Sequence, residues 1–288
     1  VTTELLGHCG DSPFPLRGMA KEERTLLFEK GRYTMDWEDI EGYLAKAQHV
    51  GYSINRAVLV GHNTVRAAVM GYEQRPPTGD EMKAMADEVR YALDHGAFGF
   101  SSGLLYPPGC YATAEELTEL CRIVAEADGL YETHIRSEDD GLEAAVEEQL
   151  TIARASGVRI QLAHLKVSRK RNWHKIEWLG RTLFDAIEKE GLDLAADRYP
   201  YTASNTGLDS VLPPWAYQGG TAKEMERLKS PQLRARIAEA VMRDYPDPTE
   251  WQSVVLASVH EQEHKEWEGR SIAELADRMN LHPVDALI

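Results

Sequence analysis

The feature that most constrains the fold is a series of short, continuously apolar runs separated by helical patterns. Such runs lie at residues 1–6, 54–60, 97–101, 129–134, 158–164, 192–197 and 253–258. Continuous runs of this length are typical of parallel strands that are covered on both faces. Capping boxes predict helix starts at Thr78, Thr113 and Ser271, each followed three residues later by a glutamate.

The spacing of the strand starts, roughly 30 to 45 residues through the middle of the chain, fits units of one strand and one helix. It favours an α/β fold of the (β/α)8 TIM-barrel type. An open doubly wound sheet stays the alternative, because spacing alone does not distinguish a closed sheet from an open one. Prolines and glycines accumulate from residue 199 to 252. We therefore expect barrel units over 1–198, an insertion over the carboxyl-terminal rim over 199–252 with one helix near 230–244, and a return to the barrel over 253–288.

Composition narrows the class of ligand. The formal net charge is −15, from 47 acidic and 32 basic residues, which disfavours nucleic acid and anionic membranes and favours a small molecule. Three cysteines are too few for a disulfide framework and fit a reducing cytoplasm, and no apolar run has transmembrane length. Because the chain starts at Val1, without Met or a signal-peptide pattern, we expect a piece of a longer protein.

Two histidines stand where two consecutive strands are expected to end. His134 closes the run 129–134 and His164 closes the run 158–164, with a helix expected between them at 139–156. The carboxyl ends of parallel strands meet at one rim, so both rings are expected to converge there. A lone strand-end histidine often bonds only a backbone carbonyl, but the pair favours metal ligation.

Other polar residues follow the same strands. Cys9 lies in Gly7-His8-Cys9-Gly10, just past the first strand. One interpretation is a zinc ligand, because a thiolate is a soft donor. The alternative is a small buried apolar residue. Its neighbour His8 is expected to point the other way. Arg136 and Lys166 each stand two residues after a histidine, so the two-residue period of a strand puts them on the same side. Two such cations suggest a site for a substrate carboxylate, with surface salt bridges as the alternative.

Two further motifs match only literally. His260 and His264 form H-E-x-x-H, but Arg270 stands where a metzincin has its third histidine, which argues against a zinc peptidase. Ser101 lies in a G-x-S-x-G motif, yet Pro107 and Pro108 follow where a nucleophile elbow needs a helix, which argues against a serine hydrolase.

Four blocks of sequence, at residues 99–109, 131–136, 161–166 and 197–203, together resemble the N-acyl-D-amino-acid deacylase (D-aminoacylase) family of the amidohydrolase superfamily. The resemblance implies a (β/α)8 barrel beside a small β domain, with zinc at the carboxyl-terminal rim. It implies Cys9, His134 and His164 as the zinc ligands. The first and last barrel strands and the β domain would then lie outside this chain.

The resemblance also implies a reaction, the zinc-dependent hydrolysis of N-acyl-D-amino acids to a carboxylate and a D-amino acid. It places Tyr106, Lys166 and Tyr199 where the family contacts the substrate's carboxylate and scissile amide. The proton-shuttling aspartate of the family would follow Ile288, so no catalytic acid or base is named within the chain. The alternatives are hydrolysis of a cyclic amide, as in dihydroorotases and hydantoinases, and a catalytically incomplete fragment with a structural or interaction role.

Overall fold

The computed structural model describes residues 1–31, 35–259 and 261–288, the side chains of 27–31 excepted. The chain divides into two compact units, Val1–Pro200 and Tyr201–Ile288. Each unit has a hydrophobic core of its own.

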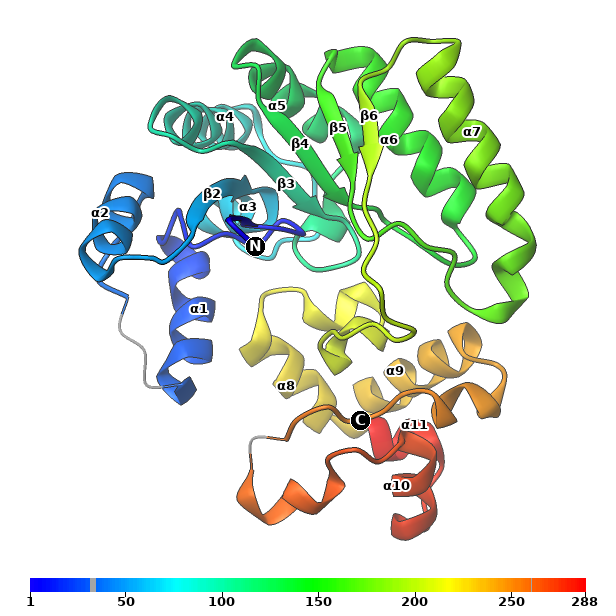
Figure 1. Cartoon of the computed structure of the whole chain (residues 1–288). Coiled ribbons are helices and arrows are strands. Elements are labelled where there is room, and N and C mark those ends of the chain that lie inside the picture. Colours follow the sequence, from blue (N-terminus) through cyan, green and yellow to red (C-terminus); the bar gives the residue numbers. More distant parts are fainter. Residues whose placement is uncertain (32–34, 260) are drawn as a thin grey trace. The chain divides into compact units, whose positions relative to one another are not determined.

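Six parallel strands form one sheet in the unit Val1–Pro200 (Figure 1). They are β1 (Thr3–Leu6), β2 (Asn55–Gly61), β3 (Gly99–Gly103), β4 (Leu130–His134), β5 (Arg159–Leu162) and β6 (Leu194–Ala196). Their order in the sheet is their order in the chain. A (β/α)8 barrel has this order, whereas a doubly wound sheet reverses its order at a switch point. The predicted barrel-type α/β fold is therefore confirmed as a partial barrel.

Helices connect the strands and bury the sheet. They are α1 (Gly18–Gly31), α2 (Ile40–Val50), α3 (His62–Met70), α4 (Gly79–Asp94), α5 (Ala114–Glu126), α6 (Leu142–Ser156) and α7 (Ile176–Glu188). Every residue of β3 is buried, and Phe100 stacks on Tyr131 of β4 within the core. Central strands buried on both faces explain why the sequence shows continuous apolar runs.

The predicted helix starts are found where the capping residues stand. At Thr78 and Ser271 both bonds of the capping box are present. The Thr113 side chain accepts the backbone N–H of Glu116, but the Glu116 carboxylate turns away to Arg66. This third box is therefore only half formed, because a buried arginine outcompetes the backbone for the carboxylate.

The unit Tyr201–Ile288 is helical. It contains α8 (Thr221–Lys229), α9 (Pro231–Asp244), α10 (Ile272–Met279) and α11 (Pro283–Leu287). The helix expected near 230–244 is confirmed as α9, and α8 precedes it. The strand expected at 253–258 is wrong, since that segment makes only an isolated antiparallel bridge, Val255 to Ser271, and bonds to nearby residues 269–272. The insertion over 199–252 and the return to the barrel over 253–288 stay predictions.

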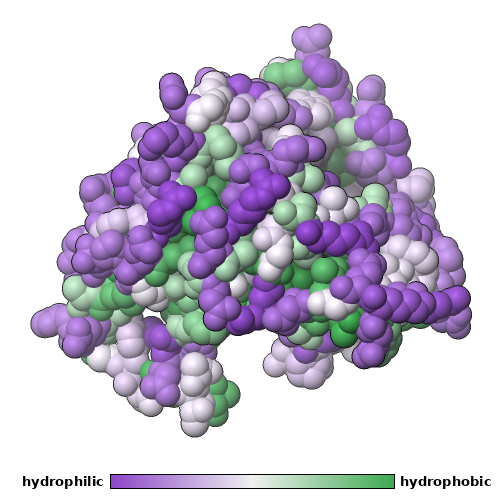
Figure 2. All heavy atoms as spheres, turned by 90° about the horizontal axis from the view of Figure 1, so that it is seen from above, coloured by the Kyte–Doolittle hydropathy of each residue, from purple (hydrophilic) through white to green (hydrophobic). Residues whose placement is uncertain are grey.

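The surface matches the charged composition. Hydrophilic side chains cover most of the face drawn in Figure 2, with separate apolar areas between them. Within the described ranges, the molecule has no helix that is both long and apolar enough to cross a membrane.

Candidate metal centre

Three side chains of types that can bind a metal gather at the carboxyl ends of β1, β4 and β5. Cys9 follows β1, His134 ends β4, and His164 lies two residues beyond β5. One ligand atom from each lies within 4.8 Å of the other two. The Cys9 Sγ atom is 3.6 Å from His164 Nε2, and the centres of the His134 and His164 rings are 4.4 Å apart. A shared tetrahedral zinc at ordinary bond lengths separates sulfur from nitrogen by about 3.5 Å, so the spacing fits.

His134 is the member of this group that most needs a partner. Its side chain is 5% exposed, and neither ring nitrogen has a hydrogen-bond partner among the described residues. Burial is the main cause that lowers the pKa of His134 to about 4, so the ring is neutral at pH 7 and keeps a free lone pair. Buried polar atoms without partners are costly, and a metal ion would remove part of that cost.

His164 is oriented by two carboxylates. Its Nδ1 lies 2.9 Å from Glu138 Oε1 and 3.0 Å from Lys166 Nζ, while its Nε2 lies on the side of Cys9. Its backbone N–H donates to Asp197 Oδ1 at 2.6 Å, and its φ is +38°. The expectation that the strand ends on His164 is wrong, because β5 ends at Leu162 and this left-handed turn directs the ring.

Cys9 also lies in a tight turn, with a φ of +54°. Its backbone N–H donates to Glu132 Oε2 at 3.1 Å. Gly103 permits the close approach of the turn to β3, since a Cβ there would lie 2.0 Å from the Cys9 carbonyl oxygen. Burial, followed by the charges of Glu132 and Glu138, raises the pKa of the Cys9 thiol to about 12. Metal binding must therefore displace the thiol proton.

Ser101 supports this turn. Its hydroxyl accepts the Gly10 N–H at 3.0 Å and donates to the Gly7 carbonyl. The residues after β3 form turns and a short 3-10 helix, Gly109–Tyr111. The hydroxyl is thus committed to backbone groups, which agrees with the prediction that Ser101 is not a nucleophile.

The structure brings three of the four residues predicted to contact substrate to the same place. The Tyr106 ring lies 4.9 Å from the His134 ring, and the Tyr199 ring lies 6.4 Å from the His164 ring. The Lys166 Nζ atom lies 5.6 Å from the Tyr199 ring centre and donates to the His164 carbonyl at 3.2 Å. It also pairs with Glu138.

Arg136 is not brought together with these residues. Its guanidinium pairs with Glu148 of α6 at 2.8 Å and donates to the carbonyls of Cys110 and Ala112 at 2.8 and 2.9 Å. Past the end of β4 the two-residue period no longer sets the direction of a side chain. Binding of a substrate by Arg136 stays a prediction that these contacts do not support.

Sequence reasoning missed several residues of the site. Glu132 stands two residues before His134, so the strand period was a signal that could have found it. Nothing in the sequence pointed to Glu138 or Asn63. The Asn63 amide, at the start of α3, donates to the carbonyls of Gly103 and Tyr106 at 3.0 and 3.2 Å and accepts the Gly103 N–H at 3.2 Å. It thereby fixes the loop that carries Tyr106.

The H-E-x-x-H motif does not provide a second centre among the described residues. His260 lies outside them, and His264 stacks on Trp267 with 4.1 Å between ring centres. Cys9, His134 and His164 are the only group in the described ranges that meets the distances for a metal site.

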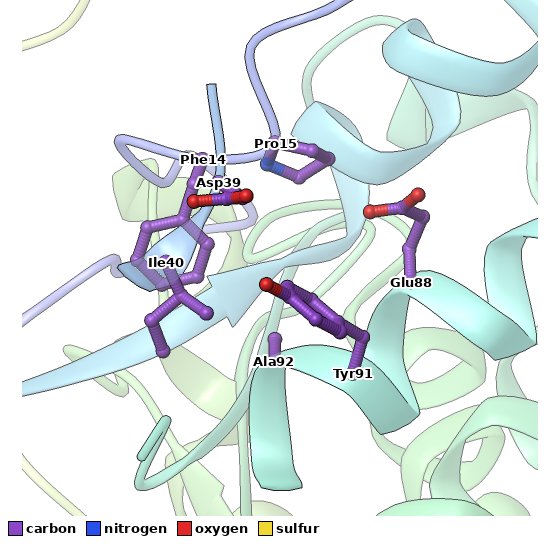
Figure 3. Close-up of a pocket in the computed structure, with 7 residues that line it drawn as sticks. All are labelled: Phe14, Pro15, Asp39, Ile40, Glu88, Tyr91 and Ala92. Atoms are coloured by element: carbon purple, nitrogen blue, oxygen red, sulfur yellow. The ribbon is translucent and has the colours of Figure 1, made fainter. Parts of the chain in front are cut away.

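A small pocket at α2 and α4 offers less chemistry (Figure 3). It is lined by Phe14, Pro15, Asp39, Ile40, Glu88, Tyr91 and Ala92. Its polar groups are already paired, because Asp39 caps α2, Glu88 pairs with Arg17, and the Tyr91 hydroxyl donates to Glu41.

Comparison with known proteins identifies relatives of the chain, although no family model matches it. A D-aminoacylase of Alcaligenes xylosoxydans xylosoxydans is 37% identical over 215 residues, which are 74% of this chain and 44% of that protein. An N-acyl-D-glutamate deacylase of the same organism is 37% identical over 212 residues, 72% of this chain and 42% of that protein.

A solved structure agrees with these relatives. The crystal structure of N-acyl-D-glutamate deacylase from Bordetella bronchiseptica, in complex with zinc and a phosphonate mimic of the tetrahedral intermediate, matches with a TM-score of 0.76 at 31% identity. This chain is a homologue of the N-acyl-D-amino-acid deacylases. The match covers 100% of this chain and 52% of the crystallised deacylase, so the chain spans about half the length of these deacylases. The resemblance inferred from the four sequence blocks is confirmed.

Proposed function

We propose that this chain carries the zinc centre of a hydrolase that cleaves N-acyl-D-amino acids into a carboxylate and a D-amino acid. The observation that carries the proposal is the convergence of Cys9, His134 and His164 from three strands, with a buried imidazole that has no other partner among the described residues. The substrate class comes from the names of the relatives, D-aminoacylase and N-acyl-D-glutamate deacylase.

The donor set fits zinc. Cys9 Sγ, His164 Nε2 and one ring nitrogen of His134 would hold it, and three protein ligands leave a position open, as catalytic zinc sites require. A zinc ion there supplies Lewis acidity toward an amide carbonyl and toward water. Glu138 keeps the His164 ring in the orientation that this coordination needs.

The substrate would be held by residues around the donors. Lys166 is the cation beside the histidines, and we assign it to the carboxylate of the acylated amino acid. Tyr106 and Tyr199 lie against the two imidazoles and would position the same substrate. Fixing the carboxylate at Lys166 determines which face of the α-carbon turns toward the metal, which is how the site would select D over L.

We also propose that the ligand is a small molecule and that the protein is cytoplasmic. A small molecule is the ligand, because a net charge of −15 disfavours nucleic acid and anionic membranes. We assign the protein to the cytoplasm on the ground of its cysteines, since Cys9, Cys110 and Cys121 are all free thiols.

The decisive experiment is Lys166→Met, with Lys170→Met, at an exposed position four residues further on, as the matched control. Zinc content and turnover of N-acetyl-D-methionine, N-acetyl-L-methionine and a hydantoin are measured on this chain and on a natural chain extended at both ends. Losing a hydrogen bond to a charged group should raise KM for the D substrate by about 10- to 100-fold and leave zinc content unchanged.

The other outcomes are informative. If Lys166→Met strips the metal, Lys166 supports the metal centre and does not bind the substrate. Turnover of the hydantoin without turnover of the acyl-D-amino acid would replace the proposed reaction with cyclic-amide hydrolysis. Absence of turnover in both chains, with zinc bound, would reject the enzyme.

A further inference from the structure

Glu132 is a buried carboxylate beside the metal centre. It lies within β4 with 0% exposure, and the two-residue strand period turns it to the same face as His134. Its Oε2 accepts the backbone N–H of Cys9 at 3.1 Å. Its Oε1 is buried without a hydrogen bond among the described residues and faces His8 Nδ1 at 3.5 Å. The prediction that His8 points away from the site therefore misses this contact.

The bond to Cys9 links two strands that are not neighbours in the sheet. A φ of +54° is uncommon for a residue other than glycine, so the turn needs contacts that hold it. Glu132 supplies one from β4, the strand that ends in His134. The cysteine and the first histidine of the centre are therefore fixed by the same strand.

The charge of Glu132 has a second consequence. A divalent cation bound by one thiolate and two neutral imidazoles keeps one positive charge, and an uncompensated charge in a buried site is costly. A carboxylate that contacts the backbone of the cysteine ligand offsets that charge.

We propose that Glu132 is a positioning residue of the metal centre, which holds Cys9 with its Sγ toward the two histidines and balances the charge of the bound cation. The proposal rests on the proposed function only in requiring that Cys9, His134 and His164 bind a divalent metal. It requires neither a substrate nor a reaction.

The test compares Glu132→Gln with Glu132→Ala. Glutamine keeps the size of the side chain and an oxygen that can accept the Cys9 N–H, but it has no charge, whereas alanine removes both functions. Zinc affinity is measured by competition with a chelator, and Co²⁺ is titrated to follow the thiolate-to-cobalt charge-transfer absorption. Losses of outer-shell partners typically weaken metal binding by about 10- to 100-fold.

We expect Glu132→Gln to weaken zinc binding about 10-fold and keep the charge-transfer absorption, because Cys9 still reaches the metal. We expect Glu132→Ala to weaken zinc binding about 100-fold and diminish that absorption. The matched control is Thr133→Val, because Thr133 is the next residue of β4, is equally buried, and bonds Ser102 on the opposite face. It should bind zinc as the wild type does.

Zinc affinity like that of the wild type in Glu132→Gln would overturn the charge role, even if Glu132→Ala failed to fold. An equal loss in Thr133→Val would overturn the proposal as a whole, because affinity would then follow general packing. Cys9→Ala distinguishes the two proposals. If it binds zinc normally, the metal centre itself is wrong, whereas lost binding in Cys9→Ala with none lost at Glu132 rejects only this inference.

Discussion

Two buried polar clusters lie in the unit Val1–Pro200. They differ in whether their side chains find hydrogen-bond partners within the protein. In one cluster, His62 and Arg66 of α3 meet Glu116 of α5, with all three side chains at most 1% exposed. Arg66 Nη1 lies 2.7 and 2.6 Å from the two carboxylate oxygens, and His62 Nε2 lies 2.8 Å from one of them. The other cluster is the candidate metal centre, where His134 has no hydrogen-bond partner among the described residues.

The difference separates a structural cluster from a binding site. One nitrogen each of His62 and Arg66 also lacks a partner among the described residues, but each side chain is anchored through its other nitrogens. His134 is anchored through neither. Because polar groups are buried at low cost only when they are paired, the anchored side chains of the α3–α5 cluster are typical of a structural cluster, whereas the unanchored His134 ring is typical of a binding site.

The largest expected effect is on the α3–α5 cluster. Glu116→Gln removes the charge that Arg66 pairs with, and breaking a buried pair in this way costs about 3–5 kcal/mol. Urea unfolding should show this loss, with zinc affinity unchanged. The control is Glu115→Gln on the neighbouring exposed residue, which should stay within about 0.5 kcal/mol of the wild type. A parallel fall in zinc affinity would show that the two clusters are not independent.

The metal centre should respond in the opposite direction. His134→Leu should lower zinc affinity at least about 100-fold, because a ligand is lost, and should stabilise the metal-free protein by about 1–2 kcal/mol, because two unpaired buried nitrogens are removed. Chelator competition and urea unfolding measure the two quantities. His62→Leu is the comparison and should destabilise the protein without affecting zinc. A destabilised metal-free His134→Leu protein would contradict the assignment of His134 as an unpaired site residue.

The burial of the strands explains how much of the fold could be predicted from the sequence. The apolar runs at 1–6, 54–60, 97–101, 129–134, 158–164 and 192–197 each overlap a strand. Burial on both faces explains the local signature of the central strands β3 and β4, but not that of β1 and β6, which are partly exposed. The run at 253–258 has the same composition but pairs locally with residues 269–272. Hydrophobicity predicts an extended, half-buried segment, and it does not say which partner the segment finds.

The residues of the candidate site could be predicted only where they follow directly from the ends of the strands. Cys9, His134 and His164 could be brought together from the sequence, because the rim of a parallel sheet collects whatever follows its strands. Arg136 could not be placed, since its contacts lie with α6 beyond the end of the strand. Asn63 reaches the Tyr106 loop from a helix, and only the tertiary structure brings the two together.

A smaller effect is expected at Asn63. Its side chain is hydrogen-bonded, like those of the α3–α5 cluster, but the bonds support the candidate metal centre. Asn63→Ala leaves the Gly103 N–H and the carbonyls of Gly103 and Tyr106 without this partner, and should cost about 1–2 kcal/mol. Amide exchange in the loop 104–110 should accelerate, while zinc affinity stays unchanged. Asn55→Ala, at an exposed position, is the control. Unchanged exchange in the loop would remove Asn63 from the support of Tyr106.

The smallest effect tests the α3–α5 cluster by pH. Burial alone would raise the pKa of Glu116, but His62 and Arg66 outweigh it and hold that pKa below the ordinary value of 4.5. A carboxyl group with a lowered pKa stabilises the fold above its unfolded-state pKa and loses that contribution as the pH falls. In chelator-treated protein, the free energies of unfolding of wild type and Glu116→Gln should therefore converge below pH 4.5, because protonation of Glu116 produces the neutral side chain that glutamine imitates. A constant difference would mean that packing of the side chain, and not its charge, stabilises the cluster.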